Sequence, residues 1–480
     1  MNNRYLEGIF APIHQEHTLT DLTVTGTIPD YLDGRYLRNG PNPVGELDPA
    51  FYHWFLGDGM VHGIRIREGR AEWYRNRWIR GSATATALGE EPILGERAPG
   101  IGANTNVIGH AGRTLALIEA GASSLELGDE LDTIGVCDFD GTVPGGYTAH
   151  PKRDPVTREL HAVSYSFARG NTVQYTVVGL DGRARRTVDI EVSGMPLMHD
   201  FSLTERYVVL YDLPVTFDPA ELKELHDAGP LLAATPMPEP ARLVLQAIAG
   251  RVRIPDPQTA SVARDLRLPY RWNPNYPARV GVMPRDGGNT DIRWFEVDPC
   301  WVFHPMNAYD DGDTVVLEVV RYPTMFDRDR TGPEEGTPAL DRWRIDLTSG
   351  AVRLDRLDDR PQEFPRVDER LTGRRHRFGY AAAVSDGVQP TGTLLKHDTL
   401  RGTTLARHFG PQKRVGEFVF HPAAPDAPED DGVLMGFVYD ADTDRSSLQL
   451  LDAGSLDTVA AVHLPHRVPA GFHGNWVPTE

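Results

Sequence analysis

Apolar and polar residues alternate in short runs along most of the chain. In residues 22–28 nearly every second position is apolar, which is the period of a strand with one buried face. Similar runs occur at 61–66, 114–118, 161–166, 172–178, 207–211, 314–320, 379–384, 417–420, 433–438 and 447–451. Asp140-Gly141, Asp181-Gly182 and Asp386-Gly387 fall between such runs and are typical of hairpin turns. The pattern predicts an all-β sandwich, barrel or propeller, and the number and length of the strands favour a propeller.

One region interrupts the strand pattern. Residues 218–227 and 239–251 have the composition of two short helices, and we expect a helical insertion at about 217–255. The second run combines Leu243, Leu245 and Ile248 with nearby arginines. Two interpretations remain open. The insertion either packs over the rest of the fold, or forms an amphipathic surface at 218–253 that contacts a membrane peripherally.

Four histidines lie among apolar or small residues at the edges of these strands. His304 follows the apolar run Trp301-Val302-Phe303 and precedes Pro305, where a strand should end or bulge because proline donates no hydrogen bond. His150, His199 and His473 have similar surroundings. A lone histidine of this kind is usually an ordinary core residue. Four of them, far apart in sequence, indicate one site assembled by a fold such as a propeller, whose inner strands face a common axis.

Imidazole is a ligand for iron, zinc, copper and nickel, so the four histidines predict a metal site without naming the metal. Such ligands usually donate their second ring N–H to a carboxylate. Glu119, Glu363 and Glu417 lie among apolar neighbours and are candidates, although each could be a surface residue at a strand edge. A hydrolytic zinc site usually has a mixed ligand set, so four histidines argue against it. Four neutral ligands leave a metal its full positive charge, which suits Fe(II) binding a neutral gas such as O2. His421 lies in a proline-rich stretch, and we place it outside the ligand set.

Composition narrows the functional classes. The chain has 480 residues, 40% of them hydrophobic, so one large domain spanning 1–480 is compatible with its length. A formal net charge of −19 argues against nucleic acid as a partner. The N-terminus has no apolar signal core, and no run reaches the roughly 18–20 apolar residues of a spanning helix. We therefore expect a cytoplasmic protein, with a peripheral membrane contact as the open alternative.

The chain resembles the carotenoid cleavage oxygenase family, almost from end to end. The matching motifs are Arg38-Asn39-Gly40-Pro41-Asn42-Pro43, Gly57-Asp58-Gly59-Met60, Ala103-Asn104-Thr105-Asn106, Ala149-His150-Pro151-Lys152, Met198-His199-Asp200-Phe201, Phe303-His304-Pro305, Glu363-Phe364-Pro365-Arg366 and Phe472-His473-Gly474. The resemblance implies a seven-bladed β-propeller with a helical and loop cap over the metal face. It also implies one non-haem Fe(II) per chain, held by His150, His199, His304 and His473 and oriented through Glu119, Glu363 and Glu417.

The resemblance further implies a dioxygenase that uses O2 to cleave an alkene C=C bond into two carbonyl products. Family members that cleave phenolic stilbenes resemble one another in a lysine before the first of these glutamates and in an upstream tyrosine. Here Ile118 occupies the lysine position, and residues 81–102 contain no tyrosine. This favours an apolar carotenoid or apocarotenoid, with Phe303, Phe472, Trp476 and Ile118 as candidate tunnel residues. The alternatives are a stilbene or phenylpropenoid-cleaving oxygenase, or a metal-stabilised propeller that binds a lipid or a protein partner without catalysis.

Overall fold

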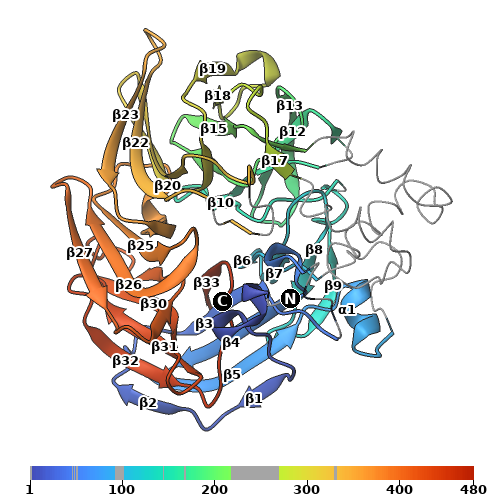
Figure 1. The fold of residues 1–480 in the computed structure, drawn as a ribbon, viewed down its shortest axis with the longest axis vertical. Coiled ribbons are helices and arrows are strands. Elements are labelled where there is room, and N and C mark those ends of the chain that lie inside the picture. Colours follow the sequence, from blue (N-terminus) through green and yellow to red (C-terminus); the bar gives the residue numbers. More distant parts are fainter. Residues whose placement is uncertain are drawn as a thin grey trace.

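Four-stranded and larger sheets surround a common centre in the computed structural model of the protein (Figure 1). The structure describes residues 3–479, except 46, 48, 50–51, 92–101, 144, 167–168, 218–269, 329–331 and 334. Within these residues seven sheets contain four to six strands each, and an eighth contains two. The chain is a seven-bladed β-propeller, as the sequence predicts.

The blades follow one another along the chain, and each runs from an inner to an outer strand. The second blade comprises β6 (Asn106–His110), β7 (Arg113–Leu117), β8 (Ser124–Leu127) and β9 (Thr133–Cys137), and the third comprises β10 (Lys152–Arg153), β11 (Leu160–Ser164), β12 (Thr172–Val178) and β13 (Ala184–Glu191). The fourth comprises β14 (Phe201–Leu203), β15 (Tyr207–Asp212), β18 (Arg279–Pro284) and β19 (Arg293–Glu296), and the fifth comprises β20 (Trp301–Asp311), β21 (Thr314–Tyr322), β22 (Ala339–Asp346) and β23 (Val352–Asp358). The sixth comprises β24 (Gln362–Val367), β25 (Phe378–Ser385), β26 (Gln389–Asp398) and β27 (Thr403–His408). Every pairing within these sheets is antiparallel.

The two ends of the chain close the ring by exchanging strands between the first and the seventh blade. The first blade comprises β1 (His17–Leu19), β5 (Arg70–Trp78), β4 (Gly59–Arg67), β3 (Gly34–Pro41) and the C-terminal β33 (Gly474–Pro478). The seventh comprises β2 (Thr23–Gly26), β32 (Thr458–His463), β31 (Arg445–Asp452), β30 (Gly432–Asp440), β28 (Lys413–Val415) and β29 (Val419–Pro422). Closure is therefore made by backbone hydrogen bonds, with Tyr36 opposite Trp476 and Gly26 opposite Ala460.

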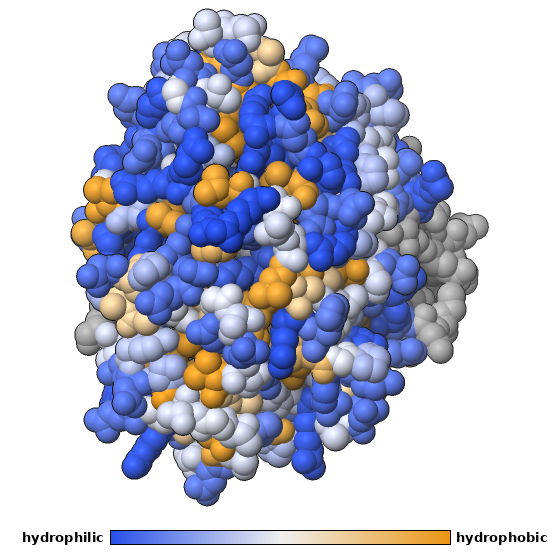
Figure 2. Space-filling view, turned by 90° about the vertical axis from the view of Figure 1, so that its left-hand side faces the viewer, coloured by the Kyte–Doolittle hydropathy of each residue, from blue (hydrophilic) through white to orange (hydrophobic). Residues whose placement is uncertain are grey.

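Burial decreases from the axis to the rim. All eight residues of β3 are buried, whereas in the outer strand β13 exposed and partly buried positions alternate. A strand enclosed by neighbouring blades is buried on both faces, whereas a rim strand with one face in water alternates between exposed and covered positions. Figure 2 shows the side of the ring that lies to the left in Figure 1, where hydrophilic residues predominate and hydrophobic residues form smaller groups between them.

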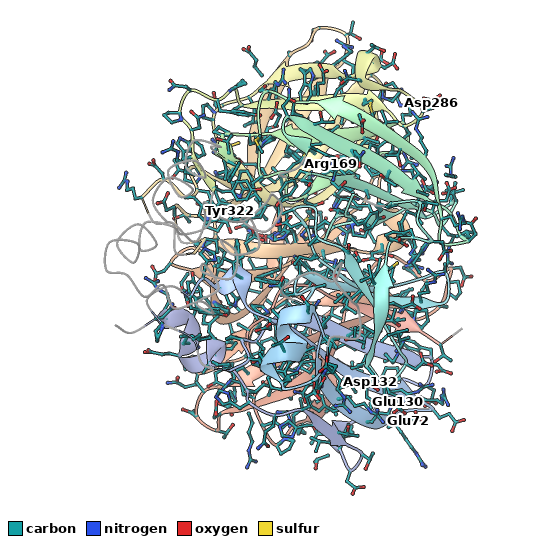
Figure 3. All side chains as sticks on the ribbon, turned by 90° about the vertical axis from the view of Figure 1, so that its right-hand side faces the viewer. Glu72, Glu130, Asp132, Arg169, Asp286 and Tyr322 are labelled. Carbon is teal, nitrogen blue, oxygen red and sulfur yellow. The ribbon has the colours of Figure 1, made fainter. Side chains whose placement is uncertain are left out.

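Charged side chains join the first two blades at their outer edge. Arg75 on β5 binds Glu130 at 2.6 Å, and Arg77 lies 3.5 Å from Asp132. Figure 3 shows Glu130 and Asp132 close to Glu72 at this edge. The three carboxylates are exposed, so each pair contributes little to stability.

Short helices and a small sheet complete the described residues. The helices are η1 (Arg4–Leu6), η2 (Gly8–Phe10), η3 (Trp54–Leu56), α1 (Ser82–Ala87), η6 (Asn289–Asp291) and η7 (Glu369–Leu371). β16 (Val215–Phe217) pairs with β17 (Tyr270–Trp272), so that Phe217 lies opposite Tyr270. The helices predicted at 218–227 and 239–251, and with them most of the insertion predicted at about 217–255, lie outside the described residues. In the described part of the chain, no helix has the length and apolar character needed to cross a membrane.

Candidate metal centre

The seven blades each bring one residue of the predicted site to the centre of the ring. In the described residues, His150 precedes β10, His199 precedes β14, His473 precedes β33 and His304 lies in β20, while Glu119 follows β7, Glu363 lies in β24 and Glu417 precedes β29. Six of the seven therefore lie at or near the start of an inner strand that runs away from the site, whereas Glu119 follows the second strand of its blade. The fold brings together all seven residues that the sequence singled out.

The four histidines converge through their ring nitrogens. His199 Nε2 lies 3.0 Å from His150 Nε2 and 3.2 Å from His304 Nε2. One ring nitrogen from each of the four, including His473, lies within 4.8 Å of all the others. Two nitrogens bound to one ion at about 2.1 Å and at right angles are about 3.0 Å apart, so these separations fit a shared metal.

The three glutamates orient three of the rings. His199 Nδ1 donates to Glu119 at 3.0 Å, His304 Nδ1 to Glu363 at 2.6 Å and His473 Nδ1 to Glu417 at 2.9 Å. A carboxylate on Nδ1 fixes the proton there and leaves the Nε2 lone pair facing the centre. Several lone pairs that face one another are unfavourable unless a cation lies between them. The donor set therefore fits a transition-metal ion.

His150 has a different neighbour. Its Nδ1 lies 4.0 Å from an Asp200 oxygen, beyond hydrogen-bonding distance, while Asp200 binds Lys152 at 3.0 Å. Burial and the three other histidines lower the pKa of His150 well below its usual value. The ring is therefore neutral at physiological pH, the form in which imidazole binds a metal.

The carboxylates change the electrostatics of their partners. Burial by itself lowers the pKa of His199, but Glu119, together with Asp200 and Glu363, outweighs burial and raises this pKa. Burial opposes ionisation of Glu417, yet Arg366, 3.1 Å away, and His473 lower the pKa of Glu417 to about 2. Glu417 is therefore a carboxylate throughout the physiological pH range.

Backbone irregularities place two of these side chains. The register of β20 shifts between Val302 and Pro305, so the strand bulges at His304 and then continues to Asp311. Of the two outcomes expected at Pro305, a strand end or a bulge, the structure has the bulge. In β24, Phe364 has a φ of 54°, a left-handed conformation that is costly for a residue with a side chain.

The conformation of Phe364 has a consequence for the site. Its N–H donates to the Glu363 carboxylate at 2.6 Å, and its ring lies 5.7 Å from the His304 ring and 5.6 Å from the His473 ring. The strained residue therefore holds a carboxylate and also packs against two of the histidines. The motif Glu363-Phe364-Pro365-Arg366 carries this residue, but the sequence alone gave no role to Phe364.

Tyrosines support the glutamates, and the sequence analysis missed them. The Tyr322 hydroxyl, at the end of β21, donates to Glu363 at 2.9 Å. Tyr165 and Tyr270 are buried near Glu119, and burial, together with this carboxylate, raises the pKa of both hydroxyls well above the usual value. No local pattern marks these tyrosines as partners of a glutamate, since each of them lies far from its glutamate in the sequence.

The four candidate tunnel residues lie in three different surroundings. Phe303 and Phe472 belong to one aromatic group beside the histidines, because both contact Phe55 and Phe303 packs edge-on against His199 at 5.3 Å. Ile118 is buried in another apolar cluster, next to Glu119 in the chain.

Trp476 lies elsewhere. It lines a polar cavity on the axis, and its ring lies 5.5 Å from that of His421. His421 is outside the group of converging histidines, as expected. A role in a substrate tunnel stays a prediction for all four residues, and Phe303 and Phe472 are those nearest to the histidines.

Comparison with known proteins identifies the family. The model of the family described as retinal pigment epithelial membrane protein matches residues 10–478. A carotenoid cleavage oxygenase of Mycobacterium tuberculosis is 57% identical over 99% of this chain and 98% of its own length. The chain belongs to the carotenoid cleavage oxygenase family. It is thus an enzyme of this oxygenase family, and the resemblance seen in the sequence motifs is confirmed.

Solved structures of this family share the same fold. Cobalt-substituted apocarotenoid oxygenase of Synechocystis superposes with a TM-score of 0.80 at 26% identity, covering 98% of this chain and 97% of that one. Lignostilbene dioxygenase of Pseudomonas brassicacearum gives a TM-score of 0.82 at 26% identity, covering 99% and 98%. The cleavage oxygenase fold therefore does not by itself distinguish a polyene substrate from a phenolic one.

Proposed function

We propose that this enzyme is a non-haem Fe(II) dioxygenase that cleaves a C=C bond of a carotenoid or apocarotenoid with O2. The observation that carries the proposal is the convergence of four imidazole nitrogens within 4.8 Å, beside a group of aromatic side chains. In the reaction one alkene bond breaks and two C=O bonds form. Both oxygen atoms come from O2, so no external reductant is required.

His150, His199, His304 and His473 would hold the iron. Four neutral ligands leave the ion its full positive charge, and Fe(II), when bound, supplies the redox chemistry with O2. Glu119, Glu363 and Glu417 keep a proton on Nδ1 of their histidines and so keep Nε2 available for the metal. The glutamates therefore set the orientation and basicity of the ligands.

The aromatic group beside the histidines supports an apolar substrate. Phe55 lies against Phe303 and Phe472 with ring centroids 6.1 and 5.6 Å apart, and Trp54 lies 4.6 Å from Phe472. Such rings exclude water and pack favourably against a conjugated chain. A polyene is the substrate that suits this side of the site.

The position before Glu119 supports the choice between the two substrate classes. Ile118 has an aliphatic side chain and is buried, so it can neither donate to a phenol oxygen nor neutralise a phenolate. A buried polar group left without a partner costs about 1–3 kcal/mol. We therefore propose that the substrate is a polyene rather than a phenolic stilbene of the kind named in the lignostilbene dioxygenase relative.

The test combines metal analysis with product identification. Iron-loaded protein is incubated with a panel of polyene aldehydes and alcohols, and the carbonyl products are identified by mass spectrometry, with 18O2 as the source of the new oxygen. His304→Ala should lose both iron and activity, while His421→Ala, a change of the same kind outside the cluster, should keep both. Full iron occupancy in His304→Ala, or an absence of carbonyl products from every polyene, would refute the proposal.

A further inference from the structure

A cavity of about 690 Å³ is lined by residues of the inner strands, and Phe55, Phe303 and Phe472 of the aromatic group are not among them. His150, His304 and His473 line its inner end. Exposed residues line its outer end, among them Leu180 in the turn between β12 and β13, Arg158 and Thr479. Buried metal ligands and solvent-exposed loops therefore share one continuous cavity, on the side to which the inner strands run.

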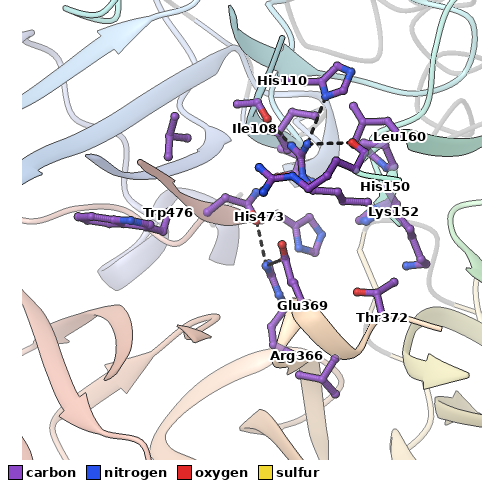
Figure 4. Close-up of a pocket in the computed structure, with 18 of the residues that line it drawn as sticks. Ile108, His110, His150, Lys152, Leu160, Arg366, Glu369, Thr372, His473 and Trp476 are labelled. Carbon is purple, nitrogen blue, oxygen red and sulfur yellow. Dashed lines mark hydrogen bonds and ion pairs between the residues drawn. The ribbon is translucent and has the colours of Figure 1, made fainter. Parts of the chain in front are cut away.

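The two sides of the histidine cluster differ in chemistry. On one side Phe303 packs edge-on against His199, and Phe472 contacts Phe55. On the other side the cavity holds ionised side chains. Figure 4 shows Lys152 beside His150 and the Arg366–Glu369 ion pair near His473. An apolar chain would have to desolvate these groups, which is unfavourable, so the cavity suits a hydrophilic solute.

The charge of the cavity favours anions. Seven arginine and lysine side chains and four aspartates and glutamates line it, and two of the arginines, Arg65 and Arg113, pair with Glu72 and Asp140 outside the lining. One positive charge remains in excess, in a chain whose net charge is −19. A concave site with an excess of one sign of charge attracts solutes of the opposite sign and raises their rate of association. A divalent metal at the inner end, with neutral ligands, would add to this attraction.

We propose that the axial cavity is a second entrance to the metal centre, through which small hydrophilic anions reach the metal. Such anions include carboxylate chelators and azide. The inference rests on the proposed metal centre. It assigns the aromatic side to the polyene and the axial side to water-soluble anions, so that the two can approach the same ion independently.

The experiment uses metal-loaded full-length protein and measures release of the metal to dipicolinate, a dianionic chelator. Leu180→Cys places a thiol at the outer end of the cavity, where the side chain is 61% exposed. The native Cys137 and Cys300 are buried, so a bulky maleimide should modify the new thiol selectively. Leu400→Cys, at a 73% exposed turn remote from the cavity, is the matched control.

Labelling at position 180 should slow release several-fold, while labelling at position 400 should not change it. Arg158→Glu should slow release to dipicolinate roughly tenfold at low salt, because it weakens the attraction of the cavity for anions. Release to neutral 1,10-phenanthroline should not change. Arg401→Glu, an exposed control of the same charge change, should affect neither chelator.

Equal rates of metal release from protein labelled at positions 180 and 400 would refute the proposal that the cavity is an entrance. Equal effects of Arg158→Glu on the two chelators would overturn its preference for anions. Metal content measured before labelling separates this inference from the proposed function. Protein that binds no metal would refute the metal centre itself, whereas metal-loaded protein that is insensitive to the label would refute only the entrance.

Discussion

Glu363→Gln is the most informative single change in the site. The Glu363 side chain is buried and accepts three hydrogen bonds: from His304 Nδ1 at 2.6 Å, from the Tyr322 hydroxyl at 2.9 Å and from the Phe364 N–H at 2.6 Å. Glutamine has nearly the same shape, but it has one acceptor oxygen and no charge. The amide NH2 must therefore face a group that had been donating to the carboxylate.

The expected loss of metal affinity can be estimated from these contacts. Loss of a carboxylate that orients a metal-bound histidine typically costs about 10–100-fold in metal affinity, or roughly 1.4–2.7 kcal/mol. Tyr322→Phe removes one of the three donors and keeps the charge, so its effect on metal affinity should be the smaller of the two. Metal affinity should therefore decrease from wild type to Tyr322→Phe and again to Glu363→Gln, because the Glu363 charge acts on His304 directly and the Tyr322 hydroxyl acts through Glu363.

The assay is a competition titration of Fe(II), under argon, against a chelator of known affinity. Circular dichroism and thermal denaturation of the metal-free proteins show whether the propeller is intact. Glu363→Gln should keep the wild-type spectrum and bind iron more weakly, with cleavage activity falling in parallel at limiting iron. A Glu363→Gln protein that binds iron as tightly as wild type would show that this carboxylate does not control the ligand.

Three further predictions test other parts of the molecule. Burial lowers the pKa of His397 to about 4, whereas the same histidine in the unfolded chain is protonated near pH 6.5. Because the unfolded chain binds more protons in this range, the free energy of unfolding should fall as pH decreases from about 6.5 to about 4. His397→Gln should flatten that part of the pH profile of thermal denaturation, and an unchanged profile would contradict the assignment. Wild-type enzyme should turn over a polyene aldehyde about 5–150-fold faster than a resveratrol-like stilbene, because a phenol beside Ile118 lacks a partner; equal rates would show that Ile118 does not decide the substrate. Leu243→Glu with Ile248→Glu should reduce liposome binding and activity on membrane-borne substrate but spare activity in detergent, whereas unchanged partitioning would favour a packed insertion.

The sequence predicts strands where burial makes them distinctive. The run 172–178 coincides with β12, and 207–211 and 314–320 begin where β15 and β21 begin. Strands at the rim escape detection, because residues such as those of β13 and β27 are largely polar and pack on one side only. The positions of these rim strands depend on the neighbouring strands with which they pair, and no local sequence pattern indicates that pairing.

The site was more predictable than the rim of the fold. The histidines and glutamates stand out because a polar residue in an apolar run is costly unless it has a partner. Tyr322 and Phe55 do not stand out, since an aromatic residue at the end of an apolar run is an ordinary core residue. Their place beside Glu363 and Phe303 depends on contacts between segments far apart in the chain. Likewise, the axial cavity results from how the blades pack, and no single segment encodes it.

Closure of the ring and assembly of the site are the same event. His473 directly precedes β33, the strand that completes the first blade, while His150, His199 and His304 belong to three other blades. An ion held by all four histidines would therefore link the closing strand to the opposite side of the propeller. Because the open ring cannot bring these ligands together, binding would favour the closed state, by about 2.7 kcal/mol when free metal is at 100 times its dissociation constant. The metal would then stabilise the architecture that creates its own site.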